Sequence, residues 1–93
     1  MAEVKKTVRS IIHGRVQGVF FRDTARQVAR RLNIKGSAVN LSDGTVEIVA
    51  EGTPKAVKKF QSWLMIGSDM ATVTKVETVD LEHHTEFKDF KIG

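Results

Sequence analysis

The sequence predicts a small α+β domain, in which two helices cover one face of a mainly antiparallel sheet. Several short segments are rich in β-branched residues or alternate apolar and polar side chains, which is typical of strands. Two longer segments carry apolar residues every three to four positions, which is typical of amphipathic helices. The 93 residues have room for one hydrophobic core, so we expect a single domain over residues 1–93.

The first half of the chain predicts a strand, a helix and a second strand. Residues 7–13 form the strand and end at Gly14, and the helix begins near Asp23, whose carboxylate suits the positive end of a helix. Gly36 is expected to mark the helix exit, and a short strand follows over about 37–41. The apolar stripe of the helix consists of Ala25, Val28, Ala29 and Leu32.

The second half begins with a hairpin. Ser42-Asp43-Gly44 is typical of a tight turn, and the alternating residues 46–51 predict a strand paired with the one before the turn. Thr53 and Pro54 suit the N-cap and first position of a second helix that ends near Gly67. The apolar stripe of this helix consists of Ala56, Val57, Phe60, Trp63 and Leu64, with Phe60 and Trp63 expected in the core.

The chain closes with strands expected over about 72–81 and 88–92, separated by an exposed loop over 82–86. The order of elements is therefore β-α-β, a hairpin, α-β and a short extra C-terminal strand. This order predicts a ferredoxin-like βαββαβ sandwich. Because that fold hosts many unrelated functions, the function must be argued from particular residues.

Composition excludes several classes of protein. The chain has no cysteine, so disulfides, thiol chemistry and thiolate metal sites are excluded. No apolar run approaches the roughly 20 residues that span a bilayer, so we expect no membrane partner. The N-terminal residues 1–6 lack the apolar stretch of a signal peptide, so we expect a cytoplasmic location. We also expect a monomer, since no sustained apolar stripe remains once the core is assigned.

Positive charge is concentrated in the N-terminal third. The net charge is +4, but residues 1–35 hold nine basic and two acidic side chains, a balance of +7. Such a distribution favours an anionic partner, either nucleic acid, an acidic protein or a small phosphate. The three arginines Arg26, Arg30 and Arg31 lie largely off the apolar stripe of their helix and are expected to face solvent.

Residues 14–22, Gly-Arg-Val-Gln-Gly-Val-Phe-Phe-Arg, connect the first strand to the first helix. Gly14 and Gly18 permit backbone angles that let successive N–H groups turn toward an anion, and the loop enters a helix N-terminus. Arg22 stands at this junction, where its guanidinium can bind two phosphoryl oxygens. The pattern matches neither a Walker A loop nor a dinucleotide fingerprint. On these residues alone, the segment fits either an anion site or a purely structural turn.

The segment 14–22 resembles a signature of the acylphosphatase family, and Asn40-Leu41-Ser42-Asp43-Gly44-Thr45-Val46-Glu47 resembles a second signature of that family. The similarity continues to about residue 92. It implies a hydrolase that cleaves the carboxyl-phosphate bond of small-molecule acyl phosphates without metal or cofactor. Arg22 would bind the phosphate and Asn40 would position the attacking water. The loop donors implied by the resemblance are the main-chain N–H groups of Arg15, Val16, Gln17, Gly18, Val19 and Phe20.

Two other functions fit part of this pattern. The fold and the basic pI would suit a nucleic-acid-binding module, but Tyr is absent and no Lys/Arg-Gly-Phe/Tyr box occurs, so we expect no nucleic-acid partner. A regulatory domain that binds a small anion without turnover is the second alternative. The histidines His13, His83 and His84 lack the spaced carboxylates of a metal site, so we expect no metal ligands among them.

Overall fold

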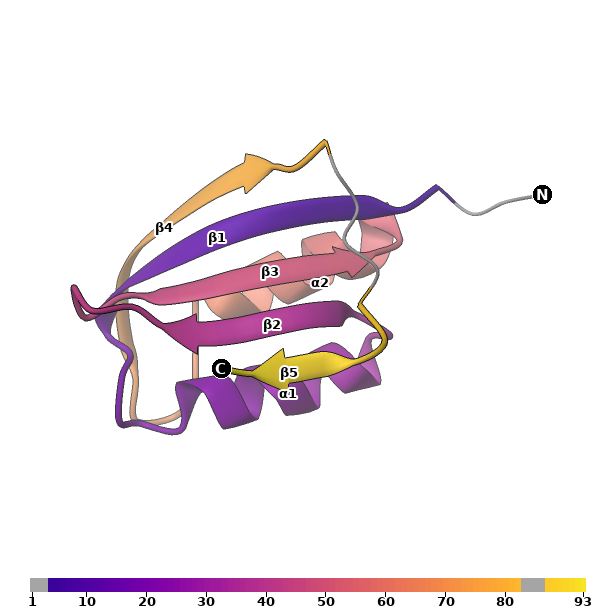
Figure 1. The fold of residues 1–93 in the computed structure, drawn as a ribbon. Helices are drawn as coiled ribbons and strands as arrows, with labels where there is room; N and C mark the ends of the chain where they lie inside the picture. The colour runs from indigo at the N-terminus through magenta and orange to yellow at the C-terminus, as the bar shows by residue number, and fades with distance from the viewer. Residues whose placement is uncertain (1–3, 83–86) are drawn as a thin grey trace.

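The computed structural model describes residues 4–82 and 87–93 and confirms the α+β fold (Figure 1). One five-stranded sheet has the order β4-β1-β3-β2-β5, in which β5 runs parallel to β2 and the other neighbours are antiparallel. Residues 83–86 of the predicted loop, with His83 and His84, lie outside the described residues. The elements are β1 (Lys6–Arg15), α1 (Phe21–Arg31), β2 (Lys35–Asn40), β3 (Val46–Gly52), α2 (Pro54–Leu64), β4 (Thr72–Asp80) and β5 (Phe90–Ile92).

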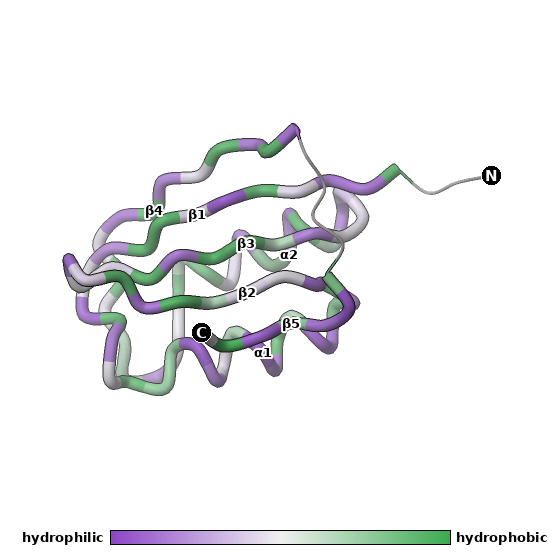
Figure 2. Tube along the Cα trace, in the orientation of Figure 1, coloured by the Kyte–Doolittle hydropathy of each residue, from purple (hydrophilic) through white to green (hydrophobic). Residues whose placement is uncertain are grey.

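The core lies between the two helices and one face of the sheet, as the sequence predicts. Val46, Ile48 and Ala50 of β3 are buried there, and Figure 2 shows hydrophobic and hydrophilic segments along this strand. Phe60 is fully buried, which confirms its predicted place in the core. Trp63 is only half-buried and stacks on Phe60, with ring centroids 6.1 Å apart. No helix in the described part of the chain is long and apolar enough to cross a membrane.

Strand β1 extends further than predicted. The strand does not end at Gly14 but continues to Arg15, which pairs with Thr72 of β4. A register shift between His13 and Gly14 allows this continuation. Gly14 has φ +121°, and a Cβ there would lie 2.0 Å from the carbonyl oxygen of Thr72. The glycine therefore permits close approach of β4 and does not end the strand.

Helix α1 is terminated by Asn33, and the prediction that Gly36 marks its exit was wrong. Asn33 has φ +58°, its N–H donates to Arg30, and the N–H of Ile34 donates to Ala29. These two bonds form a Schellman motif, which asparagine supports in place of glycine. Gly36 lies instead within β2, opposite Ala50 of β3.

We predict that Gly36→Ala destabilises the fold by roughly 2 kcal/mol or more, because overpacking against main chain is costly. A Cβ at Gly36 would lie 1.8 Å from the carbonyl oxygen of Val49. Gly44→Ala is the matched control, since Gly44 also has positive φ (+93°) but no heavy atom within 4 Å of the added Cβ. Urea unfolding of both variants measures the difference. Equal losses would show that backbone angle, not close approach, determines the need for glycine.

Candidate active site

The site is built on the β1–α1 loop, residues 16–20, whose side chains alternate in burial. Val16 and Val19 are buried in the core, whereas Gly18 and Phe20 face solvent. The two valines anchor the loop, since burying each side chain is worth about 1.5–3 kcal/mol. Ser68, from the loop after α2, is itself buried and donates its hydroxyl to the Val19 carbonyl over 2.8 Å. The main chain from Val16 to Val19 is therefore held in place by contacts with the core and with Ser68.

Main-chain donors accumulate along this loop and into the helix. Within the described part of the chain, the N–H groups of residues 17–23 donate to no acceptor. Gly18 (φ +74°) and Phe20 (φ +59°) are both left-handed, and such residues among right-handed ones build the concave arrangements of N–H groups that bind anions. The N-terminus of α1 adds its dipole to these donors. The segment therefore has the main-chain N–H donors of an anion site, and no described residue provides an acceptor for them.

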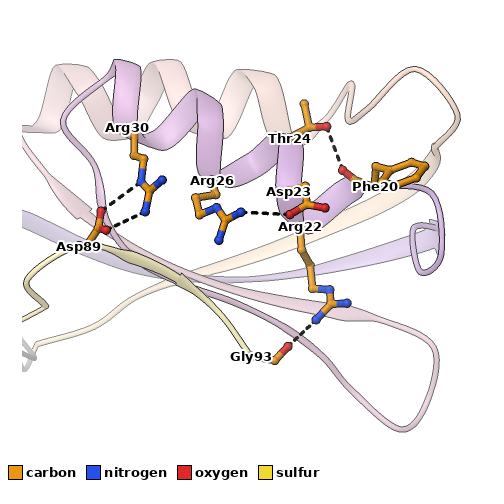
Figure 3. A network of polar contacts seen from close by, with 8 residues as sticks. All are labelled: Phe20, Arg22, Asp23, Thr24, Arg26, Arg30, Asp89 and Gly93. Atoms are coloured by element: carbon orange, nitrogen blue, oxygen red, sulfur yellow. Dashed lines mark hydrogen bonds and ion pairs between the residues drawn. The ribbon is translucent and has the colours of Figure 1, made fainter.

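Phe20 is the N-cap of α1, and it is an unusual one. N-cap residues are ordinarily extended and accept a hydrogen bond on their side chain, but Phe20 is left-handed and its side chain makes no cap bond. The left-handed conformation costs a residue other than glycine about 1–2 kcal/mol. Thr24 holds the Phe20 carbonyl through its N–H (3.0 Å) and its hydroxyl (2.8 Å; Figure 3). The helix N-terminus is thus left uncapped by the chain itself.

Arg22 extends from the first turn of α1 toward the end of β5, where its Nη1 donates to the main-chain oxygen of Gly93 (Figure 3). Gly93 is in turn held beside β2, because its N–H donates to the Ala38 carbonyl over 2.9 Å. A Cβ on Gly93 would lie 2.8 Å from a methyl carbon of Val39. Through Gly93, Arg22 is thus linked to Ala38 and Val39 of β2.

Asn40 is the last residue of β2 and shares a face with Gly36 and Ala38, which are buried under the helices. Its Oδ1 atom is buried and has no hydrogen-bond partner among the described residues. A buried carbonyl oxygen without a partner is uncommon in proteins, since leaving one unpaired costs about 1–3 kcal/mol. The carboxamide oxygen therefore has hydrogen-bonding capacity that no described residue uses.

The Gln17 side chain ties the β1–α1 loop to the β2–β3 turn. Its Nε2 donates to the carbonyl oxygens of Leu41 (2.8 Å) and Thr45 (2.9 Å). The turn is braced from within by Asp43, which accepts from both the N–H and the hydroxyl of Thr45. The Thr45 hydroxyl and then its N–H hold the pKa of Asp43 below its usual value. Gln17 therefore joins the loop to Leu41, the residue directly after Asn40.

A pocket of about 240 Å³ opens beside the loop. Of the residues predicted from the sequence, it brings together Val16, Gly18, Phe20 and Arg22; Arg15, Gln17, Val19 and Asn40 do not line it. The remaining lining residues are Phe21, Asp23 and Ile92. Sequence reasoning missed the supporting contacts of the Gln17 side chain, Ser68 and Gly93, for which no local pattern gives a signal.

Two ion pairs lie along α1, and one of them includes the pocket residue Asp23. Arg26 pairs with Asp23 at 3.3 Å, and Arg30 pairs with Asp89 at 2.7 Å at the start of β5 (Figure 3). Both pairs are exposed and screened by solvent. Arg30 and then the Phe90 N–H hold the pKa of Asp89 below its usual value.

The histidine that the structure describes takes no part in the pocket. His13 Nε2 lies 2.6 Å from Glu77 Oε1 of β4, and this hydrogen bond, followed by the charge of Lys75, lowers the pKa of Glu77. Among residues 4–82 and 87–93, no three His, Asp or Glu side chains are grouped closely enough to hold a metal ion. His13 thus belongs to a pair on the outer sheet surface.

The fold and the loop together define a small α+β protein whose main-chain donors, helix N-terminus and arginine suit a phosphoryl group. Comparisons with known proteins agree. The acylphosphatase family profile matches residues 8–92. An acylphosphatase of Hahella chejuensis is 42% identical over 88 residues, covering 95% of this chain and 94% of the relative, and one of Pyrobaculum aerophilum is 50% identical over 82 residues, covering 87% and 86%.

The crystal structure of acylphosphatase from Bacillus subtilis superposes with a TM-score of 0.91 at 33% identity, covering 95% of this chain and 98% of that one. The chain belongs to the acylphosphatase family. It is an acyl phosphate hydrolase, as the resemblance of its two signatures implied.

We predict that Gln17→Ala lowers the free energy of unfolding by about 1–2 kcal/mol, since two partly buried hydrogen bonds are lost. It should also lower kcat, because the β2–β3 turn is no longer tied to the loop. Gln27→Ala, at an exposed position of α1, is the matched control. Urea unfolding and steady-state kinetics measure both effects. Unchanged stability of Gln17→Ala would show that these two hydrogen bonds do not hold the turn against the loop.

We predict that Asp89 contributes to stability above its ordinary pKa of about 3.9 and that this contribution is lost as pH falls below it. The sign follows from the lowered pKa of Asp89 in the folded chain. Asp89→Asn should therefore flatten part of the decline in thermal stability between about pH 5 and pH 2. Asp69→Asn, at an exposed loop position, is the control. If thermal stability declines with falling pH in the same way in Asp89→Asn and in the unmodified chain, Asp89 makes no such contribution.

Proposed function

We propose that Arg22 and the loop donors bind the phosphoryl group of the substrate, and that Asn40 positions the attacking water, without metal or cofactor. The observation that carries this proposal is the run of N–H groups over residues 17–23 that have no acceptor in the described chain, next to Arg22. The inclusion of Arg15 and Val16 rests on the resemblance to the family signature. The full set of proposed donors is Arg15, Val16, Gln17, Gly18, Val19 and Phe20, together with Arg22.

The chemistry suits such a site. Water oxygen forms a bond to phosphorus while the bond from phosphorus to the acyl oxygen breaks, and the carboxylate leaves with the bonding electrons. Because a carboxylic acid has a pKa near 4–5, the leaving group needs no strong general acid. The remaining work is to stabilise charge on the phosphoryl oxygens and to align the water, which is positioning and electrostatics.

Asn40 suits the second task. Its amide does not ionise usefully, so it is no general base, but its carbonyl oxygen accepts a hydrogen bond from water. The buried, unpartnered Oδ1 supports this role, because a bound water would satisfy it. The proton released by the water is then taken by a phosphate oxygen of the substrate itself.

We also propose that the protein acts as a cytoplasmic monomer on a small-molecule substrate and does not bind nucleic acid. Among the described residues, the large exposed apolar side chains are Val4, Phe20, Met65, Ile66, Met70 and Val79, of which Met65, Ile66 and Met70 share the connection between α2 and β4. Of Phe, Tyr and Trp, only Phe90 falls within the described strands, and it is buried. Light scattering, cell fractionation and oligonucleotide binding test these statements.

We predict that Arg22→Ala lowers kcat/KM for an acyl phosphate by about 10²–10³-fold and weakens inhibition by inorganic phosphate, since a charged donor is lost. Asn40→Ala should lower kcat by a similar factor while phosphate inhibition persists, because Asn40 holds water and not phosphate. Arg31→Ala, exposed at the other end of α1, is the control. Phosphate release is measured with and without chelator. Near-normal turnover by Arg22→Ala, or loss of activity with chelator, would overturn the mechanism.

A further inference from the structure

Phe20 is the one large apolar residue of the β1–α1 loop that is left in water. Its side chain is 70% exposed although its backbone is left-handed, with φ +59°. Two positions earlier, Gly18 meets a similar requirement with φ +74° and open space around it. A glycine at position 20 would relieve the backbone and expose less apolar surface. Stability of the fold therefore does not explain why position 20 carries an aromatic side chain.

Phe20 lines the pocket that also contains Arg22. The carbonyl of Phe20 accepts two hydrogen bonds from Thr24, one from the N–H and one from the hydroxyl, and Figure 3 shows the second. These bonds hold the backbone of Phe20 at the start of α1. Ile92, half-buried in β5, lines the same pocket. The other apolar side chains of the pocket, Val16 and Phe21, are 99% buried and present almost no surface to a ligand. Phe20 and Ile92 thus supply its accessible apolar side chains.

The two ends of an acyl phosphate differ in what they need. The phosphoryl end requires the loop N–H groups and Arg22, so the acyl substituent has to extend from these donors toward the rest of the pocket. Phe20 and Ile92 line that part of the chain's surface with apolar side chains. An acetyl group has a single methyl to place against them, whereas an aromatic acyl group can cover the ring in an offset or edge-to-face contact.

We infer that Phe20, together with Ile92, binds the acyl group and makes the chain selective for acyl phosphates with an aromatic or large apolar acyl group. This inference rests on the proposed function, because the phosphoryl end must occupy Arg22 and the loop. Phe20 is then a specificity-determining residue through its side chain. Its main-chain N–H is a separate contributor to phosphate binding.

The test compares kcat/KM for benzoyl phosphate and acetyl phosphate in Phe20→Gly, Phe20→Tyr and the unmodified chain. The ratio of the two values cancels any effect of the substitution on the phosphoryl end. We expect Phe20→Gly to lower the benzoyl-to-acetyl ratio by about three- to tenfold, which is the scale of one aromatic contact. Phe20→Tyr, which keeps a ring, should retain the ratio. Val79→Ala, an exposed apolar position on β4, controls for loss of apolar surface elsewhere.

An unchanged ratio in Phe20→Gly overturns the inference while leaving the proposed function standing. So does a ratio that falls equally in Phe20→Gly and Phe20→Tyr, because the ring would then not be the determinant. The proposed function fails in a different way, if phosphate release does not depend on Arg22 for either substrate.

Discussion

The burial of two valines in an otherwise exposed loop is the constraint on which the site depends. With Val16 and Val19 inserted in the core, the main chain between and after them has no neighbouring strand to pair with. Within the described residues, the N–H groups of residues 17–20 are left without acceptors in this loop, and those of residues 21–23 have none because they form the first turn of α1. Ser68 strengthens this arrangement by donating to the Val19 carbonyl, so an acceptor of the loop is satisfied while the donors are not. Packing energy thus supports a local excess of hydrogen-bond donors.

The elements of the fold could be predicted from the sequence because each has a local pattern. Alternation in residues 46–51 and the apolar stripes of the two helices needed no knowledge of distant residues. The predictions were wrong where contact with a segment distant in the sequence determines the residue. Gly14 and Gly36 are glycines because β4 and β3 approach them closely, and both were interpreted as ends of elements. Asn33, which ends α1, is less distinctive in sequence than a glycine.

The site divides in the same way. Arg22 and Asn40 could be named from two short motifs, and the glycines of the loop indicated an anion site or a turn. The contacts that support these residues join distant parts of the chain, with separations of 24 residues for Gln17–Leu41, 49 for Ser68–Val19 and 71 for Arg22–Gly93. Such contacts depend on how the sheet and helices pack, which no local pattern encodes.

The bond between Arg22 and Gly93 has a consequence for affinity. A free arginine side chain samples many rotamers, and fixing it costs up to about 2 kcal/mol of conformational entropy. Here one of its five N–H groups is already engaged by the main-chain oxygen of Gly93, so the arm is ordered before any ligand arrives. The other four N–H groups have no acceptor among the described residues. A lysine has no second nitrogen with which to be held and to bind at the same time.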